Sequence, residues 1–187
     1  MEFSTVELEG QDEKRVQDFK NLAATAGFDP ARIESFLKEL SRNEAFCTLA
    51  YTEYEPAGFY ISRRVDGMPA EKRDERCKKR FDAVRRTVTE LSGRTDKELA
   101  EKVADSGNAF VREEIRGRGI GGRLYEAHEV HAKKLGYAYK FEAARAPDEE
   151  GDAQRILAKR AYRCIGPLGY NGQRYGKPLY GFIKLLE

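Results

Sequence analysis

Residues 116–123 read R-G-R-G-I-G-G-R, a run of glycine and arginine that invites a chemical explanation. Each glycine inside a helix costs roughly 1 kcal/mol relative to alanine, so four of them are poorly suited to a helix interior. Apolar residues recur at helical spacing from Ile120 onward, which puts this segment at a helix N-terminus. Exposed amides, the positive end of a helix dipole and guanidinium groups together favour a phosphate. The predicted anion-binding positions are Arg116, Gly117, Arg118, Gly119, Ile120, Gly121 and Gly122.

Other glycine motifs fit this segment less well. Gly117, Gly119 and Gly122 match G-x-G-x-x-G, and Glu142 follows about twenty residues later, as in dinucleotide-binding folds. That motif should directly follow a buried strand, whereas R-E-E-I-R intervenes here, and the remaining chain is too short for a six-stranded doubly wound sheet. A P-loop needs a lysine that is missing in register. A glycine-rich turn without a ligand stays open.

The histidines and cysteines do not suggest a metal centre or a nucleophile. His128 and His131 form H-E-V-H, which lacks the spacing of the zinc motif H-E-x-x-H. His131 shares the apolar side of its predicted helix, so we expect a core or rim histidine. Cys47, Cys77 and Cys164 are widely spaced with no C-x-x-C pair, so no metal site is predicted. We expect Cys164 to be a core residue, and no G-x-S-x-G is present for a serine hydrolase.

Length, composition and charge favour one folded domain that binds neither membranes nor nucleic acids. The 187 residues suffice for one domain with a core, and 40% hydrophobic residues allow that core to form. A net charge of +2 argues against a dedicated nucleic-acid coat. The acidic start lacks the features of a signal peptide, and no stretch approaches the ~18 apolar residues of a membrane span. We expect a single cytoplasmic domain, residues 1–187, with no membrane or nucleic-acid partner.

Strands and helices are predicted to alternate without an internal repeat, which indicates one mixed α/β domain. Strands are expected within residues 2–8, 45–65 (two strands joined near 55–57), 107–111, 137–145 and 178–186. Helices are expected within 11–26, 30–40, 69–91, 95–103, 120–135 and 152–165. Asn171-Gly172 predicts a tight turn before the last strand.

V-R-E-E-I-R-G-R-G-I-G-G-R-L, from Val111 to Leu124, resembles the cofactor motif (Q/R)-x-x-G-x-(G/A) of the GCN5-related N-acetyltransferases, the GNAT family. The order of predicted elements is also similar over most of the chain. The resemblance implies a mostly antiparallel central sheet with a splayed motif strand, flanked by helices. It further implies that acetyl-CoA is the acyl donor, with its pyrophosphate on the amides of Gly117 to Gly122. The pantetheine arm would pair with backbone near Phe110 and Val111.

Two features depart from the family pattern. A helical insertion at about residues 67–104 separates the third strand from the motif strand. I-L-A-K-R-A-Y-R-C-I-G-P-L-G-Y is similar to the family's late helix, but its Gly-aromatic pair, Gly169-Tyr170, lies later than usual.

The reaction implied by the resemblance suggests three catalytic candidates. Tyr162 takes the place of the family's late-helix tyrosine, whose phenol could protonate the leaving thiolate. An amine must also lose a proton, directly or through water. Glu142 is the first candidate base, because it alternates with Tyr139 and Phe141 in the predicted strand after the motif helix. Asp105, before the motif strand, is the second. The choice of base stays open.

Two functions follow as hypotheses. The first is an acetyl-CoA-dependent N-acetyltransferase that moves an acetyl group directly to a primary amine in a ternary complex, as a monomer or homodimer. The acceptor would be a small-molecule amine or a protein or peptide amine. The second is a non-catalytic acyl-CoA-binding domain that contacts a partner protein through the helices of residues 69–103. No metal is expected in either case.

Overall fold

The computed structural model describes residues 3–9, 12–53, 55–64, 82, 84–90, 93, 102–144, 157–170 and 178–186. Its elements in chain order are β1 (Phe3–Glu7), α1 (Glu13–Thr25), α2 (Pro30–Ser41), β2 (Ala45–Thr52), β3 (Pro56–Arg64), β4 (Val103–Val111), η2 (Glu113–Ile115), α5 (Ile120–Lys134), β5 (Tyr139–Ala144), β6 (Arg163–Tyr170) and β7 (Pro178–Leu185). Contacts divide the chain into unit 1, residues 1–63 and 107–135, and unit 2, residues 64–106 and 136–187. Strand β4 contributes to both units.

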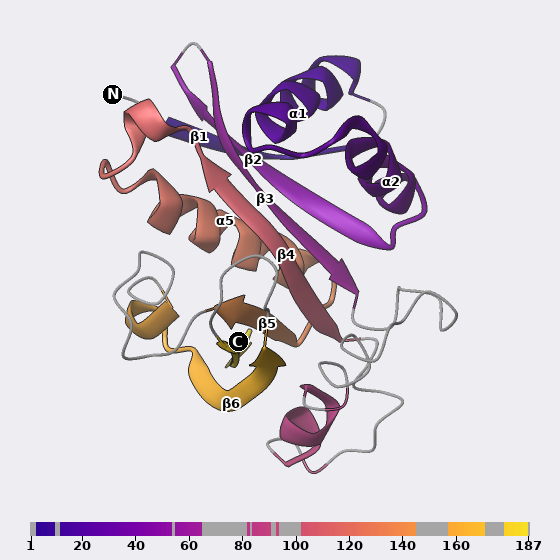
Figure 1. Ribbon diagram of the computed structural model, residues 1–187, viewed down its shortest axis with the longest axis vertical. Helices are drawn as coiled ribbons and strands as arrows, with labels where there is room; N and C mark the ends of the chain where they lie inside the picture. Colours follow the sequence, from indigo (N-terminus) through magenta and orange to yellow (C-terminus); the bar gives the residue numbers. More distant parts are fainter. Residues whose placement is uncertain are drawn as a thin grey trace. The chain divides into compact units, whose positions relative to one another are not determined.

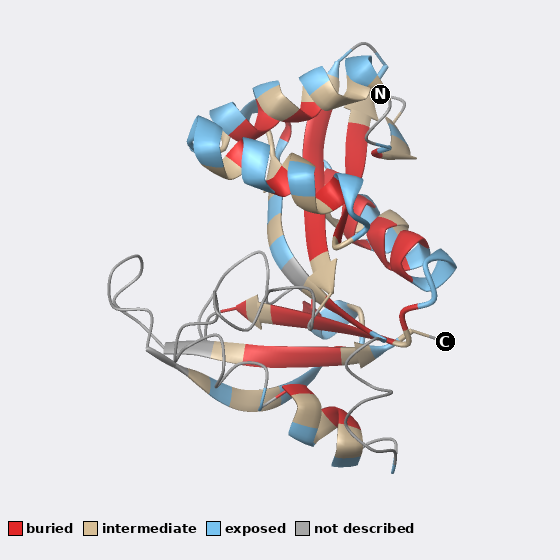
Figure 2. Cartoon of the chain, turned by 90° about the vertical axis from the view of Figure 1, so that its right-hand side faces the viewer, coloured by how far each residue is buried: buried red, intermediate tan, exposed pale blue. Residues whose placement is uncertain are grey.

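Unit 1 is a sheet covered by helices on both faces. Its strand order is β1-β2-β3-β4, and β2 pairs antiparallel with β1 and β3. Helices α1 and α2 lie on one face and α5 on the other (Figure 1). The side of α1 and α2 that faces the sheet is buried and the outer side is exposed (Figure 2). Phe19 and Phe36 pack there against Phe59, as the helical spacing of the apolar residues predicts.

The first two helices begin and end within two residues of the predicted bounds, and the predicted Asp29 cap is confirmed. Asp12 caps α1 and Asp29 caps α2, each accepting a hydrogen bond from the backbone N–H three residues later, at 3.0 and 2.8 Å. Pro30 occupies the first position of α2, where its missing N–H costs nothing. Gly27, with φ +81°, follows α1 in the left-handed conformation that favours glycine.

A chain of polar side chains ties α5 to the sheet. Thr48 Oγ1 lies 2.8 Å from His128 Nδ1 and 3.2 Å from His131 Nδ1. His128 Nε2 lies 2.8 Å from Ser62 Oγ, and His131 Nε2 lies 3.7 Å from Glu7 Oε2. A hydroxyl carries one proton, so Thr48 donates to one histidine and accepts from the other. Both histidines are buried, which confirms the expected core role of His131 and adds His128 to the core.

Acid is expected to destabilise the protein through His131. Burial lowers the pKa of this histidine below its ordinary value of 6.5, against the opposing effect of Glu7. The unfolded chain therefore binds a proton first as the pH falls, so this contribution to stability is complete above about pH 6.5 and is lost below it. Urea unfolding at pH 7, 6 and 5 should show a falling free energy, by at most about 1.4 kcal/mol per pH unit for one histidine. The His131→Gln variant should show a smaller slope, and an equal slope would contradict this account.

Unit 2 is a second sheet segment, with strand order β4-β5-β7-β6. Strand β5 pairs parallel with β4 over Val103–Asp105, while β7 pairs antiparallel with both β5 and β6. Residues 84–90 are helical, and the buried Val84 and Val88 pack against Phe141 and its neighbours. The pairings confirm the predicted mixed α/β fold with a mostly antiparallel sheet.

Several sequence expectations were wrong in detail. The helix expected over 152–165 is described only at 157–159, and β6 already begins at Arg163. Ala161 adopts a left-handed φ of +60°, and the Tyr162 N–H donates to the Leu157 carbonyl, which ends the helix. Pairing with β7 then overrides the local pattern. Cys164, expected in the core, is exposed on β6.

Other expectations concern boundaries or lie outside the described residues. Strand β4 starts at Val103, inside the predicted insertion of residues 67–104, and Pro56 belongs to β3 rather than to the turn. The Asn171-Gly172 turn and most of the helices expected at 69–91 and 95–103 lie outside the described residues, while Val103, the expected end of the second, belongs to β4. The single-domain organisation stays a prediction. Among the described helices, none combines the length and apolar character that crossing a membrane requires.

Candidate functional site

The glycine segment lies between β4 and α5, all within unit 1. Strand β4 ends at Val111, the short helix η2 follows, and α5 begins at Ile120. Ile115 and Ile120 are buried and anchor the two ends of the loop, while residues 116–119 are exposed. Gly117 and Gly119 have φ of +78° and +80°, a conformation that L side chains rarely adopt. The turn therefore requires glycine at these two positions.

The N-terminus of α5 has the properties of an anion cradle. Gly119 is its N-cap residue, and no side chain caps the helix. The first amides of a helix have no partner within it, and glycine has no side chain to supply one. A Cβ atom added at Gly117, Gly119 or Gly122 would meet nothing within 4 Å, so the surface above the loop is open. Helix amides without a capping side chain, the open space and the helix dipole suit an anion such as the pyrophosphate of acetyl-CoA, the cofactor that the family resemblance implies.

Several arginine side chains lie in the segment between β4 and the N-terminus of α5. Arg116 Nε donates to the Val111 carbonyl at 3.0 Å, while its side chain stays 52% exposed, which leaves guanidinium surface for an anion. Arg112 is held instead by the carboxylates of Glu55 and Glu114. Arg118 is exposed on the same loop. Arg116 is therefore positioned by the strand end, whereas Arg112 fixes the loop to the β2–β3 hairpin.

The end of β4 lies very close to the start of β3. A Cβ atom at Gly58 would be 2.4 Å from the Phe110 carbonyl oxygen, so this approach needs glycine at position 58. The Arg112 N–H donates to the Ala57 carbonyl at 3.0 Å. The Val111 carbonyl accepts the hydrogen bond from Arg116. These contacts fix the backbone near Phe110 and Val111, which the family resemblance relates to the pantetheine arm.

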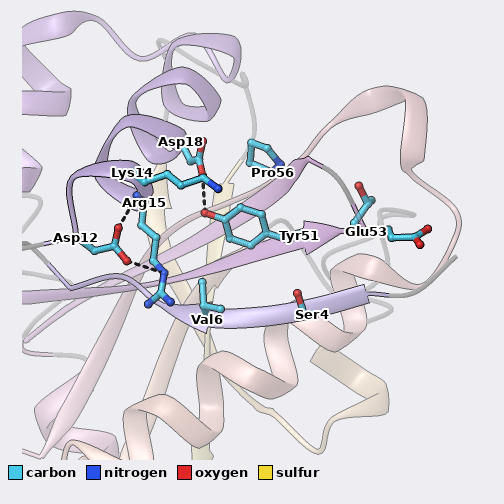
Figure 3. A pocket seen from close by; sticks show the side chains of 10 residues that line it. Ser4, Val6, Asp12, Lys14, Arg15, Asp18, Tyr51, Glu53 and Pro56 are labelled. Carbon is cyan, nitrogen blue, oxygen red and sulfur yellow. Dashed lines mark hydrogen bonds and ion pairs between the residues drawn. The ribbon is translucent and has the colours of Figure 1, made fainter.

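A pocket of about 480 Å³ opens elsewhere in unit 1, beside the start of α1 (Figure 3). Tyr51 donates to Asp18 Oδ2 at 2.8 Å in this pocket, and Arg15 pairs with Asp12 at 3.0 Å. Burial and the Asp18 carboxylate raise the pKa of Tyr51 well above its ordinary value. None of the predicted cofactor or catalytic positions lines the pocket. We assign it no role in the reaction.

The three catalytic candidates all belong to unit 2. Glu142 is in the interior of β5, only 8% exposed, with Lys140 Nζ 3.3 Å from its Oε1. Burial raises the pKa of Glu142 well above its ordinary value of 4.5. Tyr162 is buried between the helical turn and β6, rather than on a helix as expected. The Lys184 ammonium lies 5.7 Å from the centre of the Tyr162 ring.

Strand register decides which candidates share a face. Glu142 pairs with Phe182, and Lys140 pairs with Lys184, the residue beside the Tyr162 ring. Because paired residues point to the same side of a sheet, Glu142 and Tyr162 lie on one face. Strand β7 lies between β5, which carries Glu142, and β6, which begins directly after Tyr162, so the two backbones are roughly 10 Å apart.

Asp105 lies on the other face. It pairs with Phe141, whose side chain packs in the apolar core around Val84 and Val88. Successive residues of a strand alternate between faces, so Asp105 points away from the side that carries Glu142. The register therefore brings the first base candidate together with the tyrosine, and not the second.

Sequence reasoning missed Lys140 and Lys184. Lys140 alternates with the apolar Tyr139 and Phe141, a pattern typical of a solvated strand face. Its side chain is nevertheless fully buried. No sequence signal distinguishes a buried polar face from an exposed one. In the described part of the chain, no group of three or more histidine, cysteine or acidic side chains could hold a metal ion.

Comparisons with known proteins identify a family and several similar folds. The model of the acetyltransferase (GNAT) family matches residues 14–162. The structure of an aminoglycoside 6'-acetyltransferase type Ii is 14% identical, with 100% of this chain and 98% of that chain covered and a TM-score of 0.62. An N-acetyltransferase from Staphylococcus aureus Mu50 is 14% identical, with both chains covered completely and a TM-score of 0.65. An agmatine N-acetyltransferase mutant is 14% identical, with coverage of 98% and 100% and a TM-score of 0.65. The comparison with curated proteins gave no match.

Proposed function

The chain belongs to the acetyltransferase (GNAT) family, and we propose that it transfers the acetyl group of acetyl-CoA directly to a primary amine in a ternary complex. The family match covers residues 14–162 and so includes the glycine loop and the tyrosine. Bringing two reactants together in one complex supplies much of the rate of such a reaction, because orientation replaces a bimolecular encounter.

The observation that carries the proposal is the uncapped N-terminus of α5. Gly117 and Gly119 hold the left-handed turn, and the space above them is open. The amides of Ile120, Gly121 and Gly122 would bind the pyrophosphate, with Arg116 and Arg118 adding charge. The backbone at Phe110 and Val111 would bind the pantetheine arm. When bound, acetyl-CoA supplies the activated acyl group.

Two buried residues of unit 2 would move the protons. Glu142 would accept a proton from the acceptor, directly or through water, to give a neutral amine. Tyr162 would hold a proton at its phenol oxygen and release it to the departing sulfur, since a phenol and a thiol have comparable acidities. Asp105 is the alternative base, but its place in β4 on the other face of the sheet favours Glu142.

The acceptor is proposed at the level of chemical class. The names of two structural neighbours, an aminoglycoside 6'-acetyltransferase and an agmatine N-acetyltransferase, describe acetylation of amines. We propose a small-molecule amine or a protein or peptide amine for this chain. We also propose that the protein is cytoplasmic and that it is a monomer or a homodimer. It would form a single domain with a helical insertion near residues 67–104.

Ligand-dependent unfolding tests the proposed donor. Acetyl-CoA at a hundred times its dissociation constant should add roughly 2.7 kcal/mol to the free energy of unfolding. The same protein should then release CoA thiol when panels of small amines and peptides are added. A folded protein without any stabilisation at millimolar acetyl-CoA would contradict the proposal. Stabilisation without CoA release from any amine would favour the non-catalytic acyl-CoA-binding alternative.

Tyr162→Phe is expected to slow acetyl transfer and to leave acetyl-CoA binding intact. The substitution removes only the phenol oxygen, so the packing of this buried ring is kept. Loss of a general acid typically lowers the rate by about 10²–10⁴-fold. CoA release and ligand-dependent unfolding measured on the same preparation separate the two effects. Unchanged turnover would remove Tyr162 from the mechanism.

A further inference from the structure

Lys140 and Glu142 form a charged pair within the sheet of unit 2. They occupy alternate positions of β5 and so point to the same face. Lys140 Nζ lies 3.3 Å from Glu142 Oε1, and the two side chains are 0% and 8% exposed. The pair therefore lies out of contact with bulk solvent, on the strand that carries the proposed base.

Stability alone is a poor explanation for such a pair. Removing two charges from water is costly, and apolar residues of similar volume in place of a buried ion pair are often neutral or stabilising. The other face of the same strand carries Tyr139 and Phe141 in an apolar core, so β5 readily accommodates apolar residues. A chemical role for the charges on this face accounts better for their presence.

The chemistry of the carboxyl group indicates that role. Burial raises the pKa of Glu142, which favours the protonated form. A protonated carboxyl group cannot accept a proton from an amine. An ammonium group within contact distance opposes the effect of burial, because it stabilises the carboxylate.

We propose that Lys140 is a positioning residue for acetyl transfer, whose buried ammonium group holds the Glu142 carboxyl group in its ionised form. The inference rests on the proposed function, and it identifies Lys140 as the residue that keeps the proposed base, Glu142, able to accept a proton. The carboxylate takes one proton from the protonated acceptor and leaves a neutral amine with a free electron pair. Lys140 keeps its own proton throughout.

Among the described residues of the neighbouring strands, Lys184 presents a further charge near this pair. Lys184 of β7 is the register partner of Lys140, whereas Phe182 is opposite Glu142 and Ala104 of β4 is on the other side of Lys140. The Lys184 ammonium lies over the Tyr162 ring, at 5.7 Å from its centre. Lys140 is thus the lysine in ion-pair contact with Glu142, and Lys184 offers a matched control on the same face.

An NMR titration of the full chain tests the proposal without an acceptor. Side-chain carboxyl groups of ¹³C-glutamate-labelled protein are followed from pH 4 to 9, and Glu142→Gln assigns the signal. We expect Glu142 to be ionised at pH 7 in the unsubstituted protein and in Lys184→Met. In Lys140→Met we expect it to be protonated at pH 7, and Lys140→Arg should restore the ionised form.

Two outcomes would overturn the proposal. One is an unchanged Glu142 titration in a folded Lys140→Met variant, with folding checked by circular dichroism. The other is a Glu142 that is protonated at pH 7 in the unsubstituted protein. The second needs no lysine variant, so the test holds even if Lys140→Met does not fold.

Turnover with an amine from the CoA-release screen separates this inference from the proposed function. Lys140→Met should lower the rate at pH 7 on the order of tenfold or more and regain it as the pH rises, because a tenfold change corresponds to one pKa unit. Glu142→Gln should not regain it. Full activity of Glu142→Gln would reject the proposed base, while the titration would still decide whether Lys140 sets its charge.

Discussion

Gly119→Glu is expected to abolish the stabilisation of the protein by acetyl-CoA. The glutamate would put a carboxylate at the N-cap of α5, where the phosphate groups are proposed to bind, and repulsion would replace attraction. A β-carbon at φ +80° also strains the loop, at roughly 1–2 kcal/mol. The gain of roughly 2.7 kcal/mol at a hundred times the dissociation constant should therefore disappear. Thermal unfolding with and without acetyl-CoA measures the difference.

Gly136→Glu is the matched control for this variant. Gly136 follows the other end of α5 with φ +85°, and a Cβ atom there also meets nothing within 4 Å. The two substitutions should lower the stability of the ligand-free protein similarly, but only Gly119→Glu should lose the response to acetyl-CoA. An equal response in both variants would place the phosphate groups elsewhere.

Glu142→Gln is expected to lower turnover by about 10²–10⁴-fold, the usual contribution of a general base. The amide has nearly the shape of the carboxyl group but cannot accept the proton of the acceptor. Acetyl-CoA binding should persist, because the phosphate groups are proposed to bind the glycine loop and Glu142 is proposed to act on the acceptor. CoA release as a function of pH, with an amine from the screen, gives the measurement.

Asp105→Asn controls for the loss of a carboxylate near β5. Asp105 pairs with Phe141 on the opposite face, so its replacement should leave most of the activity. If Asp105→Asn were the inactive variant and Glu142→Gln the active one, the two candidate bases would exchange roles. If both remained active, water would be left as the route for the proton.

Local rules made much of the fold and the conformation of the glycine loop predictable. Asp29 followed by Pro30 favours a helix start, because the cap needs only neighbouring backbone N–H groups. The glycine loop is similarly local, since Gly117 and Gly119 supply a left-handed turn and the following apolar spacing supplies the helix. These features depend on residues a few positions apart, so the sequence alone contains them.

The late part of the chain was less predictable. The apolar spacing up to Cys164 suggests a continued helix, but Ala161 turns the backbone and the residues from Arg163 pair with β7. Strand pairing of this kind depends on residues that are distant along the chain, and it outweighs local propensity.

The catalytic arrangement was decided by tertiary structure. Successive residues of a strand point to opposite faces, so the sequence predicts that Glu142 and Phe141 of β5 lie on different faces. The sequence does not show which face is buried or which residues of the neighbouring strands lie beside Glu142. The register of β5 with β7 shows that Glu142 lies on the same face of the sheet as Tyr162. The register of β5 with β4 shows that Asp105 lies on the opposite face. The burial that makes Lys140 relevant is likewise a property of the packed molecule. The sequence by itself thus determined the family and the glycine turn before α5 through short-range spacing, whereas long-range pairing and burial decided which charged side chains meet.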